Sequence, residues 1–249
     1  MVITVRSASH PWQRAIVISL IGFILTGAVG VAFAWFLQVS GDWRAGLPWE
    51  RALLLRIDRS VPPVIDWVML GLPWLGTNLS LLPILAAFSL WLWRRKGRGE
   101  LALQLMVTIL GSLLLNAALK ALFDRPRPEL WPHRGQYQWA AYPSGHAIVG
   151  VAVFFTIALM LHRERGWLWP YFVAAGMLAV NLYSRLYLGV HWPTDVLGGL
   201  LLGVVWLAVM LYAFRPFRVA ARERAHDDGR AEPTPVAVSG RSSVEGAGA

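Results

Sequence analysis

Long runs of apolar residues, separated by short charged segments, make up most of this chain. Residues 15–39 carry no charge, and residues 64–93 carry only Asp66, near their start. Four further runs of 15 to 19 uncharged residues cover 101–119, 147–161, 166–184 and 196–214. A helix of about 20 apolar residues spans the hydrocarbon core of a bilayer. The pattern therefore predicts an all-α fold, an integral membrane bundle of six transmembrane helices.

The run at 147–161 is the shortest of the six, with 15 residues. It reaches the length of a span only if its helix begins a few residues earlier, near Pro143 and Ser144. We therefore expect the fourth span to start at this dipeptide.

The composition supports a membrane protein. Hydrophobic residues make up 56% of the 249 residues and charged residues only 15%, whereas a soluble domain carries about 25% charged residues. The net charge is +9, but the basic residues are spread over the segments between apolar runs. A nucleic-acid-binding protein would gather them on one soluble face, so no nucleic-acid partner is predicted. The chain has no cysteine, which excludes disulfides.

The basic residues also predict the orientation of the bundle. Fourteen of the 23 lie before the first run or after the second, fourth and sixth runs, segments that share one side of the membrane. Because cytoplasmic loops accumulate Lys and Arg, we expect a multi-pass protein of the inner (plasma) membrane with both termini in the cytoplasm. The predicted parts are a cytoplasmic N-terminus (1–14), a membrane domain (15–217) and a cytoplasmic tail (218–249). The tail is rich in Gly, Ser, Ala, Pro and charge, which is typical of disorder.

The segment 42–59, between the first two spans, alternates apolar and basic residues at near-helical spacing. This pattern fits either an amphipathic helix at the membrane interface or an ordinary connecting loop. Tryptophans near the predicted outer boundary indicate an aromatic belt at the interface. They are Trp43, Trp49, Trp74, Trp131, Trp139 and Trp192.

Three clusters of polar residues stand at predicted outer ends of the later spans. The clusters are Lys120 with Arg127-Pro128; Tyr142-Pro143-Ser144-Gly145-His146; and Ser184-Arg185 with His191 and Asp195. They follow the third span, begin the fourth, and connect the fifth to the sixth. Because a bundle brings such helix ends together, we expect the three clusters to form one site at the extracytoplasmic ends of these helices.

The first cluster supplies two cations. Pro126 and Pro128 stop the helix that carries Lys120. Arg127 is then able to turn back over a bound anion instead of continuing along the helix axis.

The second cluster is a helix start. Ser144 is a good N-cap, and the first backbone N–H groups of the helix have no partners within it. Together with the helix dipole, these groups make a binding site for phosphate. Gly145 allows the backbone to approach the anion closely, and His146 follows in the first turn.

The third cluster supplies a reactive pair. A helix that starts near Trp192, with Pro193 in its first turn, places His191 and Asp195 one turn apart. A carboxylate that accepts a hydrogen bond from one imidazole nitrogen fixes the tautomer, so the lone pair of the other nitrogen points outward. A histidine in this state acts as a nucleophile or a base. Arg185 adds a third cation, whose planar fork fits phosphate oxygens.

Together the clusters resemble the tripartite signature of the type 2 phosphatidic acid phosphatase superfamily. That signature is Lys-x6-Arg-Pro, then Pro-Ser-Gly-His, then Ser-Arg-x5-His-x3-Asp, and every position is matched here. The resemblance covers about residues 101–214 closely. It implies a membrane enzyme that removes phosphate from a lipid on the outer face of the bilayer and needs neither a metal nor a cofactor.

The resemblance also implies a role for each matching residue. His191 would attack phosphorus and form a phosphohistidine, Asp195 would orient His191, and His146 would protonate the leaving oxygen and then activate water. The phosphoryl oxygens would be bound by Lys120, Arg127, Ser144, the backbone of Gly145, and Arg185.

Three other functions share part of this pattern. Soluble vanadium-dependent haloperoxidases of the same superfamily have the same anion pocket, but six spans argue against them. A phosphotransferase that takes phosphate from a polyprenyl pyrophosphate would share every residue named above. A catalytically silent lipid-binding or transport protein is disfavoured by the intact catalytic set and by the scarcity of ionisable residues within the spans. The substrate stays open among phosphatidic acid, phosphatidylglycerol phosphate and undecaprenyl pyrophosphate.

Overall fold

The computed structural model describes residues 11–60, 63–71, 78–95, 99–132, 139–215 and 217. The regular structure within these ranges is entirely helical, as predicted. Its elements are α1 (Pro11–Val39), α2 (Pro48–Ser60), the 3-10 helix η1 (Pro63–Ile65), α3 (Asp66–Gly71), α4 (Asn78–Arg94), α5 (Gly99–Phe123), α6 (Gly145–Arg165), α7 (Trp169–Tyr187) and α8 (Pro193–Ala213).

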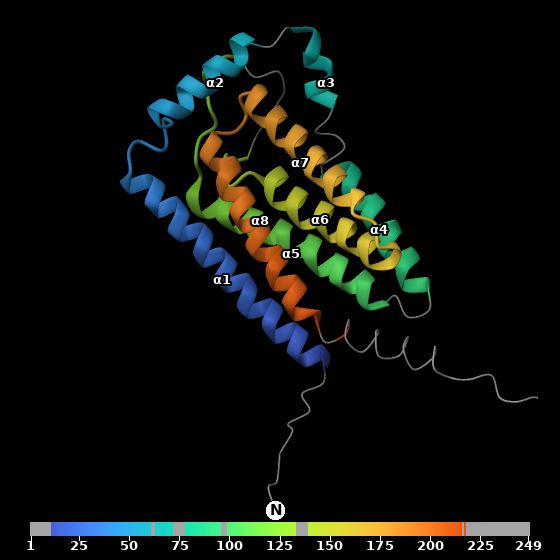
Figure 1. Ribbon diagram of the computed structural model, residues 1–249. Helices are drawn as coiled ribbons and strands as arrows, with labels where there is room; N and C mark the ends of the chain where they lie inside the picture. The colour runs from blue at the N-terminus through green and yellow to red at the C-terminus, as the bar shows by residue number, and fades with distance from the viewer. Residues whose placement is uncertain are drawn as a thin grey trace, which may run out of the picture.

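The long helices form a bundle with α6 at its centre. α6 packs against α5, α7 and α8, while α1 packs against α8 and α4 against α5. Figure 1 shows these helices running side by side, with α1 along one edge and α4 along the other. α2 and α3 lie at the upper end of the bundle, and α1 begins and α8 ends at the opposite end. This arrangement leaves the starts of α6 and α8 close together beneath α2.

Four of the described helices, α1, α5, α6 and α8, are long and apolar enough to cross a membrane. α1 also exposes large apolar side chains along its length, among them Ile16, Leu20 and Ile24. Such exposure suits a lipid environment, in which the surface of a helix need not be polar. The protein is therefore a multi-pass membrane protein, and the count of six spans stays a prediction. α7, which carries Asn181, Ser184 and Arg185 near its end, is not among these four.

The range 64–93, predicted as one span, holds two separate described helices instead. α3 has six residues and α4 has 17, with Pro83 inside it. Gly71 is the last residue of α3, and the sequence continues with Leu72-Pro73, where proline disfavours helical backbone in the residue before it. The predicted tail, 218–249, lies outside the described residues.

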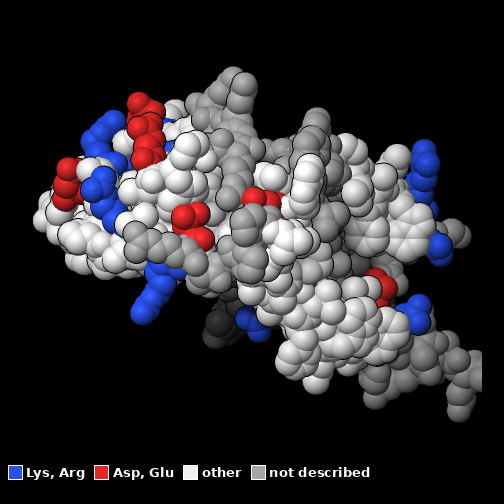
Figure 2. Space-filling view, turned by 90° about the horizontal axis from the view of Figure 1, so that it is seen from above, with Lys and Arg blue, Asp and Glu red and all other residues white. Residues whose placement is uncertain are grey.

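Residues 48–60 form a helix, so an ordinary connecting loop is excluded there, while its place at the membrane interface stays a prediction. Its inner face buries Glu50, Leu54 and Ile57, whereas Arg51 and Arg56 are exposed. Leu54 packs with Ala141 and Trp192, and Ile57 packs with Tyr187, Leu188 and Val190. α2 thus covers the loops that carry the second and third clusters. Figure 2 looks down on this end of the bundle and shows a group of basic and acidic side chains at its left edge, where α2 lies.

Two glycines bring α8 against α6. A Cβ atom at Gly199 would lie 2.5 Å from the carbonyl oxygen of Ser144, and one at Gly203 would lie 3.0 Å from that of Ile148. Only glycine allows backbones this close, as is common between membrane helices. This contact positions the start of α6 against the start of α8.

Candidate active site

The structure brings the three clusters together at the α2 end of the bundle. The N–H of Ser144 donates to the carbonyl of Asp195 at 3.0 Å, which joins the second cluster to the third. Nη1 of Arg127 donates to the carbonyl of Val190 at 2.5 Å, which joins the first cluster to the third. The predicted convergence of the clusters is therefore confirmed.

Ser144 is the N-cap of α6, but its hydroxyl does not cap the helix. α6 begins at Gly145, as expected, and Ser144 has the extended backbone of an N-cap, with φ −72° and ψ 111°. Its side chain makes no capping hydrogen bond, and its Oγ atom is buried without a partner in the described structure. The predicted N-cap position of Ser144 is thus confirmed, although its side chain does not cap the helix. A buried hydroxyl without a partner is costly, unless it serves a ligand.

The first turn of α6 carries two further features of the site. A Cβ atom at Gly145 would lie 2.9 Å from Nδ2 of Asn116, so α5 approaches the helix start closely. Nε2 of His146 and Oδ1 of Asn116 are buried without hydrogen-bond partners in the described structure. Sequence reasoning missed Asn116, although it precedes Lys120 by one helical turn on α5.

Lys120 and Arg127 both bind backbone carbonyls around the site. The ammonium group of Lys120 donates to the carbonyl of Ala140. Arg127 donates through Nε to the carbonyl of Trp139 at 2.8 Å, in addition to its bond with Val190. α5 ends at Phe123, before the two prolines, so Arg127 turns back toward the third cluster as predicted. Its guanidinium is held there by the loops on either side.

Arg185 is buried on the last turn of α7. Its Nε and Nη2 atoms lie 3.3 Å from Oγ of Ser184, and that hydroxyl donates to the carbonyl of Asn181 at 2.6 Å. Ser184 therefore orients the guanidinium. This contact gives the serine of the third cluster a role that spacing alone did not show.

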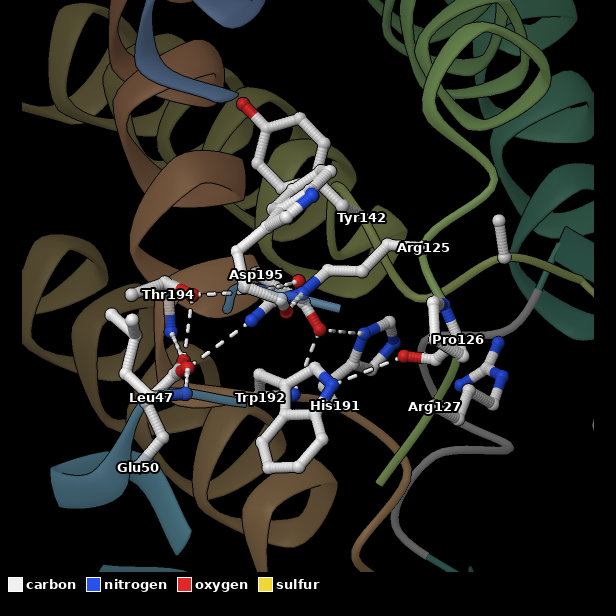
Figure 3. A network of polar contacts seen from close by, with 12 residues as sticks. Leu47, Glu50, Arg125, Pro126, Arg127, Tyr142, His191, Trp192, Thr194 and Asp195 are labelled. Atoms are coloured by element: carbon white, nitrogen blue, oxygen red, sulfur yellow. Dashed lines mark hydrogen bonds and ion pairs between the residues drawn. The ribbon is translucent and has the colours of Figure 1, made fainter. Parts of the chain in front are cut away.

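His191 and Asp195 face each other, but they are not hydrogen-bonded in this structure. Nδ1 of His191 lies 3.6 Å from Oδ2 of Asp195, which suits an ion pair and exceeds the length of a hydrogen bond. Oδ2 instead accepts the N–H of Trp192 at 2.7 Å. α8 starts at Pro193, as predicted, so this bond belongs to the first turn of the helix. The carboxylate is aimed at the imidazole by the helix start itself (Figure 3).

The surroundings of His191 favour its neutral form. Burial lowers the pKa of this imidazole well below its ordinary value, and the nearby cations Arg127, Lys120 and Arg185 act in the same direction. A backbone hydrogen bond with Ala141 opposes them and is the weakest of these influences. A neutral imidazole keeps a lone pair, which is the state that a nucleophile requires.

Tyr142 anchors the loop before α6. Its hydroxyl donates to the carbonyl of Gly30 on α1 at 2.8 Å. Burial raises the pKa of this phenol, and the charge of Asp195 adds to the effect, so the group stays protonated and remains a donor. The ring also packs against Trp43 and Phe123. The second cluster is thereby tied to α1.

A buried network behind Asp195 escaped sequence reasoning. Nη1 of Arg125 donates to Oδ1 of Asp195 at 2.6 Å and to Oγ1 of Thr194 at 2.7 Å. Nη2 lies 3.1 Å from Oε2 of Glu50, and Nε donates to the carbonyl of Trp43 at 2.7 Å. Oε1 of Glu50 accepts both the N–H and the hydroxyl of Thr194, at 3.0 and 2.6 Å. Figure 3 shows this network around Arg125. The available signal was Arg125 itself, a cation placed directly before Pro126.

The expected aromatic belt is wrong for two of its members. Trp43 and Trp192 are buried, with 5% and 2% of their surface exposed. The guanidinium carbon of Arg125 lies 4.8 Å from the ring centre of Trp43 and 5.5 Å from that of Trp192. Both rings pack in the site because they cover a buried cation. Trp49 and Trp139 are exposed, as the prediction required, and Trp74 lies outside the described residues.

The assembled groups suit phosphate chemistry. Two imidazoles, three cations and a helix start with a buried hydroxyl lie together at one end of a membrane bundle. Cations and helix N-terminal N–H groups stabilise the charge of a phosphoryl group in transfer. Within the described ranges, no three His, Asp or Glu side chains come together as ligands for one metal ion.

A membrane bundle with such a site defines a class, the integral membrane phosphatases that hydrolyse phosphate esters. Comparison with known families agrees, because the model of the PAP2 superfamily matches residues 101–218. The chain belongs to the PAP2 superfamily.

Individual relatives support this assignment. Phosphatidylglycerophosphatase B of Bacillus subtilis (strain 168) is 34% identical over 152 residues, which cover 57% of this chain and 72% of the relative. Undecaprenyl-diphosphatase BcrC of the same organism is 30% identical over 144 residues, which cover 53% of this chain and 69% of the relative. A solved transmembrane PAP2-type phosphatidylglycerolphosphate phosphatase from Bacillus subtilis has a TM-score of 0.63 at 23% identity, covering 86% of this chain and 98% of that one. This last likeness supports the fold.

Proposed function

We propose that the protein is a metal-independent lipid phosphate or pyrophosphate phosphatase that acts through a phosphohistidine on His191, at the outer face of the membrane. The observation that carries the proposal is a buried imidazole whose neutral form is favoured by three surrounding cations. Those cations disfavour an imidazolium and attract a phosphate, so they prepare both partners of the reaction.

In the first step, the nitrogen of His191 remote from Asp195 attacks phosphorus. An N–P bond forms while the bond between phosphorus and the leaving oxygen breaks. His146 donates a proton to that oxygen, and its buried Nε2 has no competing hydrogen bond in the described structure. Asp195, 3.6 Å from Nδ1, balances the positive charge that develops on His191.

In the second step, water releases the phosphate. His146 takes a proton from the water, whose oxygen attacks phosphorus. The N–P bond breaks, and inorganic phosphate leaves with His191 neutral again. One imidazole thus serves as acid and then as base, as general acid–base catalysis allows.

Five groups bind the phosphoryl oxygens in this proposal: Lys120, Arg127, Ser144, the N–H of Gly145, and Arg185. The hydroxyl of Ser144 supports it most directly, because this buried group does not cap its own helix. An ammonium has three donors and a guanidinium five. Lys120 and Arg127 are therefore able to bind loop carbonyls and an anion together.

The carboxylates near the site support a reaction without a metal. Asp195 and Glu50 both pair with the guanidinium of Arg125, at 2.6 and 3.1 Å. These carboxylates are therefore already engaged by the guanidinium of a side chain. The phosphoryl charge is met by the cations of the first and third clusters, which would supply the electrostatic stabilisation that a metal gives in other phosphatases.

The substrate class follows from the relatives and from the position of the site. Phosphatidylglycerol phosphate and undecaprenyl pyrophosphate are the substrates named for relatives, and phosphatidic acid presents the same terminal phosphate. The site lies at helix ends, so a lipid phosphate reaches it while the tail stays in the bilayer. The bias of basic residues toward the opposite side supports an outer-face site.

The test is phosphate release by the purified protein from these three lipids in the presence of EDTA. We expect release from at least one lipid, inhibition by vanadate, which mimics phosphorus in transfer, and no release by the His191→Ala variant. Complete loss of activity in EDTA that Mg²⁺ restores would contradict the metal-free mechanism. The alternative, a phosphotransferase, is tested by a parallel reaction with an acceptor lipid. It is identified if phosphate appears on the acceptor and if no phosphate is released when the acceptor is left out.

A further inference from the structure

Arg125 and Glu50 form an ion pair that has no access to solvent. The side chains of Arg125, Glu50 and Asp195 are all 0% exposed. Removing such charges from water is costly, and the cost is offset only where geometry and hydrogen bonding are good. Here the guanidinium meets two carboxylates, a hydroxyl and a carbonyl.

The pair is attached to the carboxylate that faces the nucleophile. Arg125 holds Oδ1 of Asp195 at 2.6 Å, while the N–H of Trp192 holds Oδ2 at 2.7 Å. With both oxygens held, the carboxylate is not free to rotate, and Oδ2 stays aimed at His191. An opposite charge at this distance also stabilises the ionised form of a buried carboxylate.

Glu50 in turn sets the position of Arg125. Its Oε2 atom accepts the N–H of Leu47 at 2.8 Å, at the start of α2, as well as the guanidinium. Its Oε1 atom accepts from Thr194, the residue next to Asp195 in the first turn of α8. Glu50 therefore ties α2 to Arg125 and to Thr194, which precedes Asp195 in the first turn of α8. It lies outside residues 101–218, the part that matches the family.

We propose that Arg125 and Glu50 are positioning residues for phosphoryl transfer, which act through Asp195 to keep its carboxylate aimed at His191. The inference rests on the proposed function of His191 as the nucleophile. Through Glu50 alone, the helix that covers the loops then helps to position a residue of the site. This arrangement also separates two tasks: Arg125 and Glu50 orient the carboxylate that faces the nucleophile, and other residues bind the phosphate.

The experiment separates these two tasks by kinetics. Arg125→Lys keeps the charge but loses the fork that meets Asp195 and Glu50 together, and Glu50→Gln keeps the volume but loses the charge. Each purified variant is mixed with a labelled aryl phosphate, and rapid quench gives the rate of phosphoenzyme formation at saturating substrate. Competitive inhibition by inorganic phosphate, a ground-state ligand, gives the affinity of the anion pocket. Arg56→Gln, an exposed position on α2, is the matched control.

We expect phosphoenzyme formation to slow about 10- to 100-fold in both variants, because a misaligned catalytic group costs up to about 100-fold per ångström. Affinity for inorganic phosphate should change less than about threefold, and Arg56→Gln should match the parent protein. In an Asp195→Asn background, Arg125→Lys should add less than about threefold, because the two residues act as a unit.

The alternative is a purely structural role. It predicts equal losses in affinity for inorganic phosphate and in rate, or additive effects in the Asp195→Asn background, and either result overturns the proposal. Rates within threefold of the parent in both variants overturn it as well. If Arg125→Lys does not accumulate in membranes, Glu50→Gln decides alone. Phosphoenzyme in His191→Ala would instead refute the proposed function, so the two failures are distinguishable.

Discussion

The contact between Gly199 and the start of α6 offers a test of how tightly the site is built. A methyl group added by Gly199→Ala would lie 2.5 Å from the carbonyl oxygen of Ser144 and 2.7 Å from Cβ of Ala147. Ordinary contact begins at 3.4 Å, so the two helices must separate by about 0.9 Å. The obstacle includes backbone, which has no alternative rotamer.

The expected loss follows from that displacement. Overpacking of this kind costs about 1–3 kcal/mol of stability. Displacing the helix start by about 1 Å should also slow catalysis about 100-fold, because Ser144, Gly145 and His146 move with it. Vanadate affinity should fall too, since these residues bind the anion in our proposal.

Gly176→Ala is the matched control. Gly176 also lies inside a helix, α7, and nothing lies within 4 Å of an added Cβ atom. Alanine there should be neutral or stabilise the helix by up to about 1 kcal/mol. The assays are thermal unfolding in detergent and phosphate release. If Gly199→Ala retained parental activity and vanadate affinity, the reasoning that α8 positions the phosphate-binding helix start would be wrong.

Three further predictions concern mechanism and orientation. His146→Ala should still release a burst of nitrophenol from an aryl phosphate and then stall as a phosphoenzyme. General acid catalysis is worth about 10²–10⁴ in rate, and a good leaving group needs little of it. Rapid quench should find neither a burst nor a labelled enzyme in His191→Ala. Because burial and nearby cations lower the pKa of His191, its imidazole stays neutral below the ordinary value of about 6.5. The rate of the burst with an aryl phosphate should therefore not fall as the pH drops through 6.5. Alkaline phosphatase fused after Gly135 should be active, and fused after Arg98 inactive, if the site faces outward.

Each of these has a contrary outcome. Labelled His191→Ala together with a missing burst in His146→Ala would exchange the two roles. A burst rate that halves near pH 6.5 would indicate an ordinary imidazole at position 191. The reverse pattern of fusion activity would place the site in the cytoplasm.

The helix boundaries around the site were predictable from the sequence because local chemistry sets them. Prolines at 126 and 128 end the helix that carries Lys120, and Pro193 begins the next helix after His191. The membrane environment was equally evident, since apolar runs of this length typically span a bilayer as helices. The three clusters were recognisable because their residues lie close together in the chain, at spacings that local backbone geometry connects.

Other features depended on contacts between distant residues. Arg125 and Glu50 are 75 positions apart, and Glu50 and Thr194 are 144 apart, so no local pattern joins them. Glu50 lies in a helix that mixes apolar and charged residues, and the local sequence does not show which way its carboxylate points. Only the packing of α2 onto the loops turned that carboxylate inward.

The sequence determined least well which side chains are buried inside the protein. In a bilayer, lipid and protein interior are both apolar, so hydropathy does not separate an outward face from an inward one. Trp43 and Trp192 were therefore expected at the interface, whereas the structure places them around Arg125. The sequence determined which residues stand at the helix ends, and tertiary packing decided which of their groups lie together, because it alone sets the distances between helices.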